Sequence, residues 1–279
     1  MIAVKVEPQS LARIKDTLLD AATELKTTNR YEVFRFRINS GVIVAYTSGK
    51  IVANNDESYE LLKRVLGSAE TLEDEIAIGS DETGKGEWLG PLVVSAVAVS
   101  PYAMAEFRSI GVMDSKELTT KRIEQIAPQI KKLALGFKVI VIQPKRFNDL
   151  FDQFKKEGKG LNGMLAWAHT EAIKNVYAEI RPKAKVRITI DEFDRIKTEE
   201  RLGELKEMPN VTIVQKPRAE EDISVACASI LAKAERERWI TEKSKMLNVN
   251  LRKIKEKDAL TMDEREELFK ASYLKDRDN

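Results

Sequence analysis

Short apolar segments alternate with helical patterns along most of the chain, and this alternation constrains the fold more than any other sequence feature. From residue 76 onward, the strand-like segments are 76–80, 92–100, 137–142, 186–190 and 211–214. Helical periodicity is found at about residues 103–109, 120–134, 145–155, 161–180, 197–207 and 223–244. Two successive strands followed by strands separated by helices predict an α/β fold, in which helices flank a mixed sheet.

A smaller unit precedes this sheet. Its expected elements are a strand at 2–6, a helix at 9–26, strands at 31–38, 41–46 and 51–53, and a helix at 57–66. This order predicts a small α+β domain over residues 1–68. The acidic segment 69–75 is interpreted as a linker to a larger domain over residues 76–279.

The composition excludes several classes of protein. Hydrophobic residues make up 43% and charged residues 33% of the 279 residues, which is typical of a globular protein with a charged surface. No apolar run approaches the length of a membrane span, so we expect no membrane partner. A single cysteine excludes an internal disulfide and fits a cytoplasmic protein, which we expect to be monomeric. Because the net charge is only +2, any binding of nucleic acid must rely on local basic patches and metal ions.

Two adjacent acids, Asp81 and Glu82, directly follow the first strand of the larger unit, and Gly84-Lys85-Gly86 comes next. Adjacent carboxylates repel each other, and their burial is costly unless a cation lies beside them. Carboxylate oxygens suit Mg²⁺ or Mn²⁺. The glycines allow the backbone to approach a phosphate or a sugar hydroxyl closely. This segment therefore predicts a metal site beside a nucleic-acid backbone.

Further acids follow the later strands. Asp191 ends one of them, and Glu220-Glu221-Asp222 follows another. Ligands of such sheets bind at the carboxyl ends of strands, so these acids can converge with the first pair to form the site that two-metal phosphodiester hydrolysis requires. Taken singly, each acid is more simply a surface charge or a helix cap, because the chain contains 45 acidic residues. Acids at the ends of two apolar strands, one of them beside a glycine-rich loop, favour the metal site.

Five blocks resemble, in the same order, the type 2 and type 3 ribonucleases H. The opening block is Asp81-Glu82-Thr83-Gly84-Lys85-Gly86, followed by Leu89-Gly90-Pro91. The other blocks are Gly111-Val112-Met113-Asp114-Ser115-Lys116, Asn162-Gly163-Met164-Leu165-Ala166-Trp167-Ala168-His169, Ile190-Asp191-Glu192-Phe193, and Arg218-Ala219-Glu220 with Val225-Ala226-Cys227-Ala228-Ser229-Ile230-Leu231-Ala232-Lys233. The N-terminal unit is similar to the TATA-binding-protein-like domain of type 3 enzymes, and together with the form Gly79-Ser80-Asp81-Glu82 it favours the type 3 branch, ribonuclease HIII.

The resemblance implies an RNase H-like fold and an endonuclease that uses two Mg²⁺ or Mn²⁺ ions. Such an enzyme cleaves the RNA strand of RNA–DNA hybrids and leaves 5′-phosphate and 3′-hydroxyl ends. Two alternatives stay open. One is a type 2 activity at single ribonucleotides embedded in duplex DNA. The other is a non-catalytic nucleic-acid-binding protein that has kept the fold, which predicts missing acids, whereas Asp81, Glu82 and Asp191 are all present.

The resemblance also assigns roles to residues. It makes Asp81 the acid that bridges both metal ions, with Glu82 and Asp191 as further ligands. The fourth ligand falls on Glu220, although the segment is shorter than the family pattern, which leaves Glu221 or Asp222 as alternatives. Gly84-Lys85-Gly86 matches the loop that reads the 2′-hydroxyl, the group that distinguishes RNA from DNA. Glu87-Trp88-Leu89 departs from the family, which usually has Asp with a Tyr-Phe pair.

Several further candidates lie outside the acids. Ser115 and Lys116 match a block near the site and are candidates for phosphate contact, although the start of a helix explains them equally well. Asn162 is a candidate for substrate contact at the start of a predicted helix, where an ordinary cap is the alternative. His169, the only histidine, is interpreted as a packed helical residue, because the metal ions already account for the nucleophile. Cys227 is interpreted as a core residue.

The N-terminal unit also carries a candidate nucleic-acid surface. Tyr31, Arg35 and Arg37 alternate onto one face of a predicted strand, and Lys50 lies on a nearby strand. A sheet face that mixes basic and aromatic side chains suits a nucleic-acid backbone, and a routine solvated face is the alternative. We expect Arg35 and Arg37 to contact the hybrid.

Overall fold

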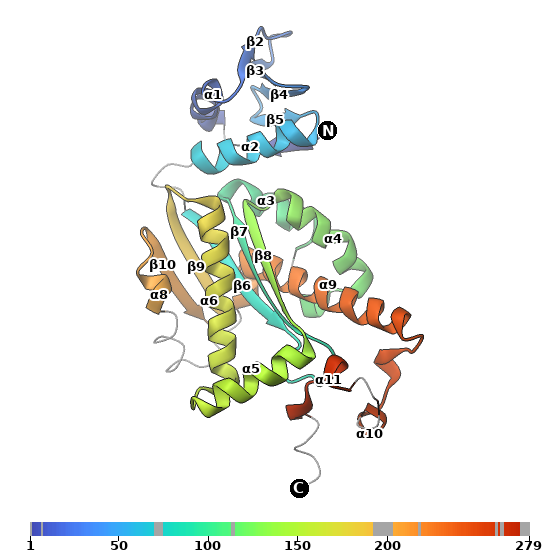
Figure 1. The fold of residues 1–279 in the computed structure, drawn as a ribbon. Helices are drawn as coiled ribbons and strands as arrows, with labels where there is room; N and C mark the ends of the chain where they lie inside the picture. Colours follow the sequence, from blue (N-terminus) through green and yellow to red (C-terminus); the bar gives the residue numbers. More distant parts are fainter. Residues whose placement is uncertain are drawn as a thin grey trace.

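A computed structural model describes residues 2–6, 8–69, 75–112, 115–191, 203–216, 219–259, 262 and 265–273. Within these residues the chain forms two five-stranded sheets, one at the top of Figure 1 and the other in its centre. The N-terminal sheet lies above the larger one in this view, and the C-terminal segments lie below it. Among the described helices, none has the length and the apolar character that crossing a bilayer requires.

The N-terminal sheet is antiparallel, with the strand order β1-β5-β4-β3-β2. Its elements are β1 (Ile2–Lys5), η1 (Pro8–Ser10), α1 (Leu11–Leu19), β2 (Thr23–Leu25), β3 (Glu32–Ile38), β4 (Gly41–Tyr46), β5 (Lys50–Ala53) and α2 (Asp56–Ala69). One face is buried against α1 and α2, where Phe34 and Phe36 lie at the centre of an apolar cluster. The other face is open to solvent and carries Arg37 and Lys50.

The helix predicted over residues 9–26 was wrong in its second half. The apolar periodicity continues through Ala22 and Leu25, but α1 ends at Leu19. Thr23–Leu25 instead forms the edge strand β2, which pairs antiparallel with Arg35–Arg37 of β3. Pairing with a strand that is distant in sequence overrides the local helical pattern here.

The larger sheet is mixed, as predicted, with the strand order β10-β9-β6-β7-β8. Its strands are β6 (Glu75–Thr83), β7 (Leu92–Val99), β8 (Gly136–Ile142), β9 (Lys185–Asp191) and β10 (Val211–Lys216). β6, β9 and β10 run parallel, whereas β7 is antiparallel to both β6 and β8. The carboxyl ends of the three parallel strands therefore meet at one edge of the sheet.

Helices cover both faces of this sheet. α5 (Pro144–Lys156) and α6 (Gly160–Ile180) pack on one face, and α3 (Pro101–Ser109), α4 (Thr120–Leu133) and α9 (Ile223–Met246) pack on the other. Shorter elements are η2 (Ser115–Glu117), α8 (Gly203–Lys206), η3 (Ala219–Glu221), η4 (Leu251–Lys253), α10 (Glu256–Ala259), α11 (Arg265–Leu268) and η5 (Ala271–Tyr273). The part of the predicted helix 197–207 that precedes residue 203 lies outside the described residues.

The two sheets belong to units that touch directly. The hydroxyl of Tyr102, at the start of α3, donates a hydrogen bond to Ser10 Oγ at 3.1 Å. Lys132 of α4 lies 3.8 Å from the Asp56 carboxylate of α2. The domain boundary predicted at residues 69–75 stays a prediction, because residues 70–74 lie outside the described ones.

Gly79 of β6 fixes the distance between the sheet and α9. A Cβ atom on this residue would lie 2.1 Å from the backbone of Ser224 and Val225, far inside van der Waals contact. Only glycine therefore allows the first turn of α9 to pack directly on β6. This close approach brings the start of α9, and η3 before it, to the edge where β6 ends.

Candidate functional site

Asp81 and Glu82 lie near the end of β6, as predicted, but the strand continues to Thr83 and does not stop at Ser80. Asp81 pairs with Ser95 of β7 and Glu82 with Val94. The apolar run ends at Ile78, so the sequence pattern ended the strand too early. Strand pairing holds both backbones rigidly, which fixes the two adjacent carboxylates at the edge of the sheet.

The environment of Asp81 disfavours its charged form. Burial raises the pKa of this carboxyl group to about 7, and the neighbouring charge of Glu82 adds to the rise. A hydrogen bond with the side chain of Ser229, on α9, opposes it. Near neutral pH, Asp81 is thus close to its midpoint of ionisation, a state that a bound cation would shift to the carboxylate.

Glu82 has the opposite balance. Although burial works against ionisation, a hydrogen bond with His169 and the nearby charge of Lys85 lower its pKa. His169 Nε2 lies 3.2 Å from Glu82 Oε2, and Lys85 Nζ lies 3.6 Å from Glu82 Oε1. One acid of the pair is therefore held ionised while its neighbour is held partly protonated.

His169 is buried in the helix α6, which confirms the interpretation of a packed histidine, but it also has a role that the sequence analysis missed. Its Nδ1 lies 2.7 Å from Ser80 Oγ, and the Ser80 hydroxyl donates a hydrogen bond to the Ser95 carbonyl at 2.8 Å. The ring is thus held between β6 and the Glu82 carboxylate. A lone polar residue on an apolar helix face was the available signal, because buried polar groups require partners.

Asp191 and Glu220 are placed by their backbones only. Ser80 of β6 pairs in parallel with Ile190 of β9, so Asp81 and Asp191 come next on two adjacent strands. Glu220 lies in η3, next to the start of α9. The side chains of both residues lie outside the described ones, and among the side chains that are described no group of three His, Cys, Asp or Glu residues is placed to hold a metal ion.

The two alternative fourth ligands differ in their surroundings. Asp222 caps α9 by accepting hydrogen bonds from the Ser224 amide and hydroxyl at 3.0 and 2.7 Å. It also accepts a hydrogen bond from Arg187 Nη1 at 2.6 Å, and against the effect of burial these contacts lower its pKa. Its carboxylate oxygens are thus already used, which disfavours it as a metal ligand. Glu221 is exposed in η3.

The glycine loop, residues 84–91, continues directly from the acids. Gly84, Gly86 and Gly90 have φ values of +86°, +75° and +77°, a region that residues with side chains rarely adopt. A Cβ on Gly84 would lie 2.4 Å from the Pro91 carbonyl oxygen, whereas a Cβ on Gly86 would meet no atom within 4 Å. The space beside the Cα atom of Gly86 is therefore open, and the exposed Lys85 is the preceding residue.

The three further candidates for substrate contact differ in their burial and in their contacts. They are Ser115, Lys116 and Asn162. Ser115 is buried, with its hydroxyl 2.7 Å from that of Ser229, so it supports the residue that hydrogen-bonds Asp81. Lys116 is exposed beside it. Asn162 is not a cap, because α6 begins at Gly160 and its N-cap is Lys159. It lies in the first turn of the helix and is only partly buried.

The open face of the N-terminal sheet is less basic than the sequence suggested. A β-bulge in β3 next to Glu32 lets this buried acid reach Arg35 on the same strand. Arg35 Nη2 lies 2.6 Å from Glu32 Oε1, and this pairing is the main reason why the pKa of Glu32 falls to about 2. A shallow groove on this face is lined by Tyr31, Arg35, Val42, Val44, Tyr46 and Lys50, among others. Arg35 is thus largely neutralised, and Arg37 and Lys50 carry the positive charge.

The chain is similar to known ribonucleases H over most of its length. The family model described as ribonuclease HII matches residues 78–271. The chain belongs to the ribonuclease HII family. Among curated relatives, ribonuclease HIII of Chlamydia pneumoniae is 33% identical over 72% of this chain and 68% of its own length. Ribonuclease HIII of Chlamydia caviae is 31% identical over 86% of this chain and 80% of its own.

These relatives place the chain in the ribonuclease HIII branch of the family. Ribonuclease HIII of Protochlamydia amoebophila is 34% identical, and the match covers 67% of this chain but only 63% of that protein. The crystal structure of Bst-RNase HIII in complex with Mn²⁺ aligns with a TM-score of 0.60 at 25% identity, over 97% of this chain and 94% of that one. Aquifex aeolicus RNase H3, at 20% identity and a TM-score of 0.56, shares the fold over 98% of this chain.

Replacing His169 with glutamine is expected to weaken metal binding by this protein about 10- to 100-fold if Glu82 is a metal ligand, because the Glu82 carboxylate loses the partner that orients it. Isothermal titration with Mn²⁺ measures the affinity directly. Asn175→Ala, on the exposed side of the same helix, is the matched control and should bind Mn²⁺ like the parent. An unchanged Mn²⁺ affinity in a folded His169→Gln variant would contradict this role.

Asp81 is expected to make the metal-free protein less stable as the pH rises. Its pKa is about 7 in the folded protein and 3.8 in the absence of structure, so between these values the folded state binds more protons than the unfolded state. Stability from this group is complete below about pH 4 and is lost by about pH 7. Thermal melting in chelator should show Asp81→Asn to be more stable than the parent at about pH 8. Equal melting temperatures of the two proteins at this pH would show that ionisation of Asp81 does not destabilise the folded protein.

Proposed function

We propose that this protein is an endoribonuclease that hydrolyses the RNA strand of RNA–DNA hybrids, and that it leaves 5′-phosphate and 3′-hydroxyl ends. The observation that carries the proposal is the half-buried Asp81–Glu82 pair at the edge of the sheet, followed at once by a glycine loop with open space beside Gly86. Family membership supports it, since the curated relatives are named ribonuclease HIII.

Asp81, Glu82, Asp191 and Glu220 are the proposed metal ligands. The surroundings of the first pair fit a divalent cation, because burial and the adjacent charge hold Asp81 partly protonated until a positive charge relieves it. When bound, two Mg²⁺ or Mn²⁺ ions would activate the attacking water and stabilise the leaving oxygen of the phosphodiester. Within the chain, His169 and Ser229 keep the first two carboxylates in fixed positions for these ions.

The remaining groups are proposed to position the substrate. Backbone amides of Gly84-Lys85-Gly86 would contact the 2′-hydroxyl of the RNA strand, which DNA lacks. Lys85, Lys116 and Asn162 lie on elements around the acids and would contact phosphates or sugars. The N-terminal sheet, on the far side of the larger sheet from the C-terminal segments, would bind the hybrid farther along its length (Figure 1).

Cleavage assays with chelator, Mg²⁺ or Mn²⁺ test the chemistry. We expect Asp81→Asn to lose activity on a long hybrid by at least about a hundredfold, since charge stabilisation at the reacting phosphate is removed. A DNA duplex with a single embedded ribonucleotide, assayed in parallel, distinguishes a type 2 activity from the proposed one. Equal activity of parent and Asp81→Asn would overturn the mechanism.

Replacing both Arg37 and Lys50 with alanine is expected to weaken hybrid binding equally for all sequences, because these residues would meet phosphates and not bases. The dependence of log affinity on log salt concentration should become shallower by about one for each phosphate that the variant no longer binds. Binding is measured in chelator to prevent cleavage. Lys253→Ala, an exposed lysine beyond α9, is the control. An unchanged affinity and salt slope would remove the N-terminal sheet from the binding surface.

A further inference from the structure

Lys270 is a fully buried lysine beside the glycine loop, outside all the residues assigned so far. Its side chain has no exposed surface, an uncommon environment for a lysine. Nζ donates a hydrogen bond to the Gly90 carbonyl at 2.6 Å and lies 5.5 Å from the centre of the Phe147 ring. The ammonium group is thus enclosed between α5 and the end of the glycine loop.

The backbone on either side of Lys270 is also hydrogen-bonded to the glycine loop. We call residues 265–273 the C-terminal strap. The Lys270 amide donates to the Trp88 carbonyl at 2.7 Å, and the Gly90 amide donates to the Leu268 carbonyl at 2.9 Å. Leu89 and Phe269 form an antiparallel bridge between these bonds, and the Trp88 and Phe269 rings lie 5.2 Å apart. The strap is therefore hydrogen-bonded along the second half of the loop.

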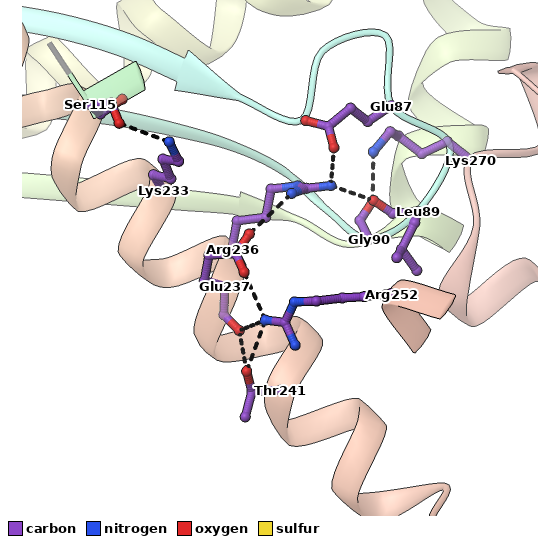
Figure 2. Close-up of polar contacts among 10 residues, drawn as sticks. All are labelled: Glu87, Leu89, Gly90, Ser115, Lys233, Arg236, Glu237, Thr241, Arg252 and Lys270. Atoms are coloured by element: carbon purple, nitrogen blue, oxygen red, sulfur yellow. Dashed lines mark hydrogen bonds and ion pairs between the residues drawn. The ribbon is translucent and has the colours of Figure 1, made fainter. Parts of the chain in front are cut away.

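Arg236 reaches the same loop from α9. Its Nη2 donates to Glu87 Oε2 at 2.6 Å and to the Leu89 carbonyl at 2.9 Å, with only 8% of the side chain exposed. Arg236 and Lys270 thus donate hydrogen bonds to the carbonyl oxygens of two consecutive residues, Leu89 and Gly90 (Figure 2). Burial and the charge of Arg236 lower the pKa of Lys270 to about 7. Two buried cations this close repel each other, so this arrangement is costly for the fold alone.

The glycine loop cannot hold this conformation by itself. Three of its eight positions are glycines with positive φ, which leave the free chain unusually mobile. Within residues 84–91 one internal backbone hydrogen bond is present, from the Glu87 amide to the Gly84 carbonyl at 3.3 Å. The conformation of the loop therefore depends on contacts from outside, which Arg236 and Lys270 provide at Glu87, Leu89 and Gly90.

We propose that Arg236 and Lys270 are positioning residues that hold the glycine loop in the shape that recognises the RNA strand. This inference rests on the proposed function, since it takes that loop to contact the 2′-hydroxyl. Neither residue touches the reacting atoms. Their effect is to keep backbone donors fixed at the substrate, where small displacements are costly.

The test compares Lys270→Met with the parent, both as full-length chains. Methionine keeps the apolar stem and removes the ammonium group. We expect kcat/KM on a long hybrid to fall about 10- to 100-fold, mainly through KM, because the displaced loop binds the substrate less tightly. Hydrogen exchange at amides of residues 84–91 should become faster, whereas Mn²⁺ affinity stays as in the parent. Lys145→Met is the matched control, because Lys145 pairs with Glu267 of the same strap at 3.2 Å but is exposed and does not contact the loop.

Arg236→Lys is the second variant, in case Lys270→Met does not fold. Lysine keeps the charge, but its ammonium group lies one atom closer to the backbone than Arg236 Nη2, the nitrogen that donates to both Glu87 and Leu89, so the same rise in KM and faster exchange are expected. A folded variant with the KM and loop exchange of the parent overturns the inference, as does faster exchange without a change in KM. If the parent itself fails to cleave hybrids, the proposed function fails instead, so the two failures are distinguishable.

Discussion

The contact between Gly79 and the first turn of α9 is the constraint on which the site depends. Because no side chain separates β6 from the backbone of Ser224 and Val225, α9 runs directly behind the acids. Residues on one face of this helix, three or four positions apart, then contact the site. Ser229 bonds Asp81, and Lys233 donates to the Ser115 carbonyl at 2.8 Å. Arg236, one turn farther on, holds the glycine loop (Figure 2). A bulkier residue at position 79 would displace all of these contacts together.

The charged and polar groups around the site reduce the repulsion between two adjacent carboxylates. Asp81 and Glu82 are adjacent on a strand, where both cannot be fully ionised at low cost without a cation. The chain reduces this cost unevenly, with His169 and Lys85 beside one acid and a single hydroxyl beside the other. An arrangement that is unfavourable in the metal-free protein would favour a divalent cation at these proposed ligands. Stability is thereby exchanged for function, as is common at active sites.

The sequence was informative where structure is set locally. Apolar runs and turn residues predicted every strand of the two sheets except β2 within a few residues. The strand ends predicted that Asp81 and Asp191 lie near each other, and their backbones are on adjacent strands. Contacts that depend on strand pairing and packing were not predictable. The pairing that made Thr23–Leu25 a strand, the bulge that joined Glu32 to Arg35, and the approach of His169 to Glu82 across 87 residues all depend on tertiary packing. The side chains of Asp191 and Glu220 lie outside the described residues, so the metal set stays a prediction.

The bond between Lys270 and Gly90 joins residues that are 180 positions apart in the chain. Closing a loop of this length costs more entropy than forming a local contact, so we expect this bond to form late in folding. All five strands of the larger sheet precede the strap in the sequence and can assemble without it. The carboxylates can thus be in place while the adjoining loop is still mobile. During synthesis, the loop that is proposed to recognise the substrate would be the last part of the site to take its final shape.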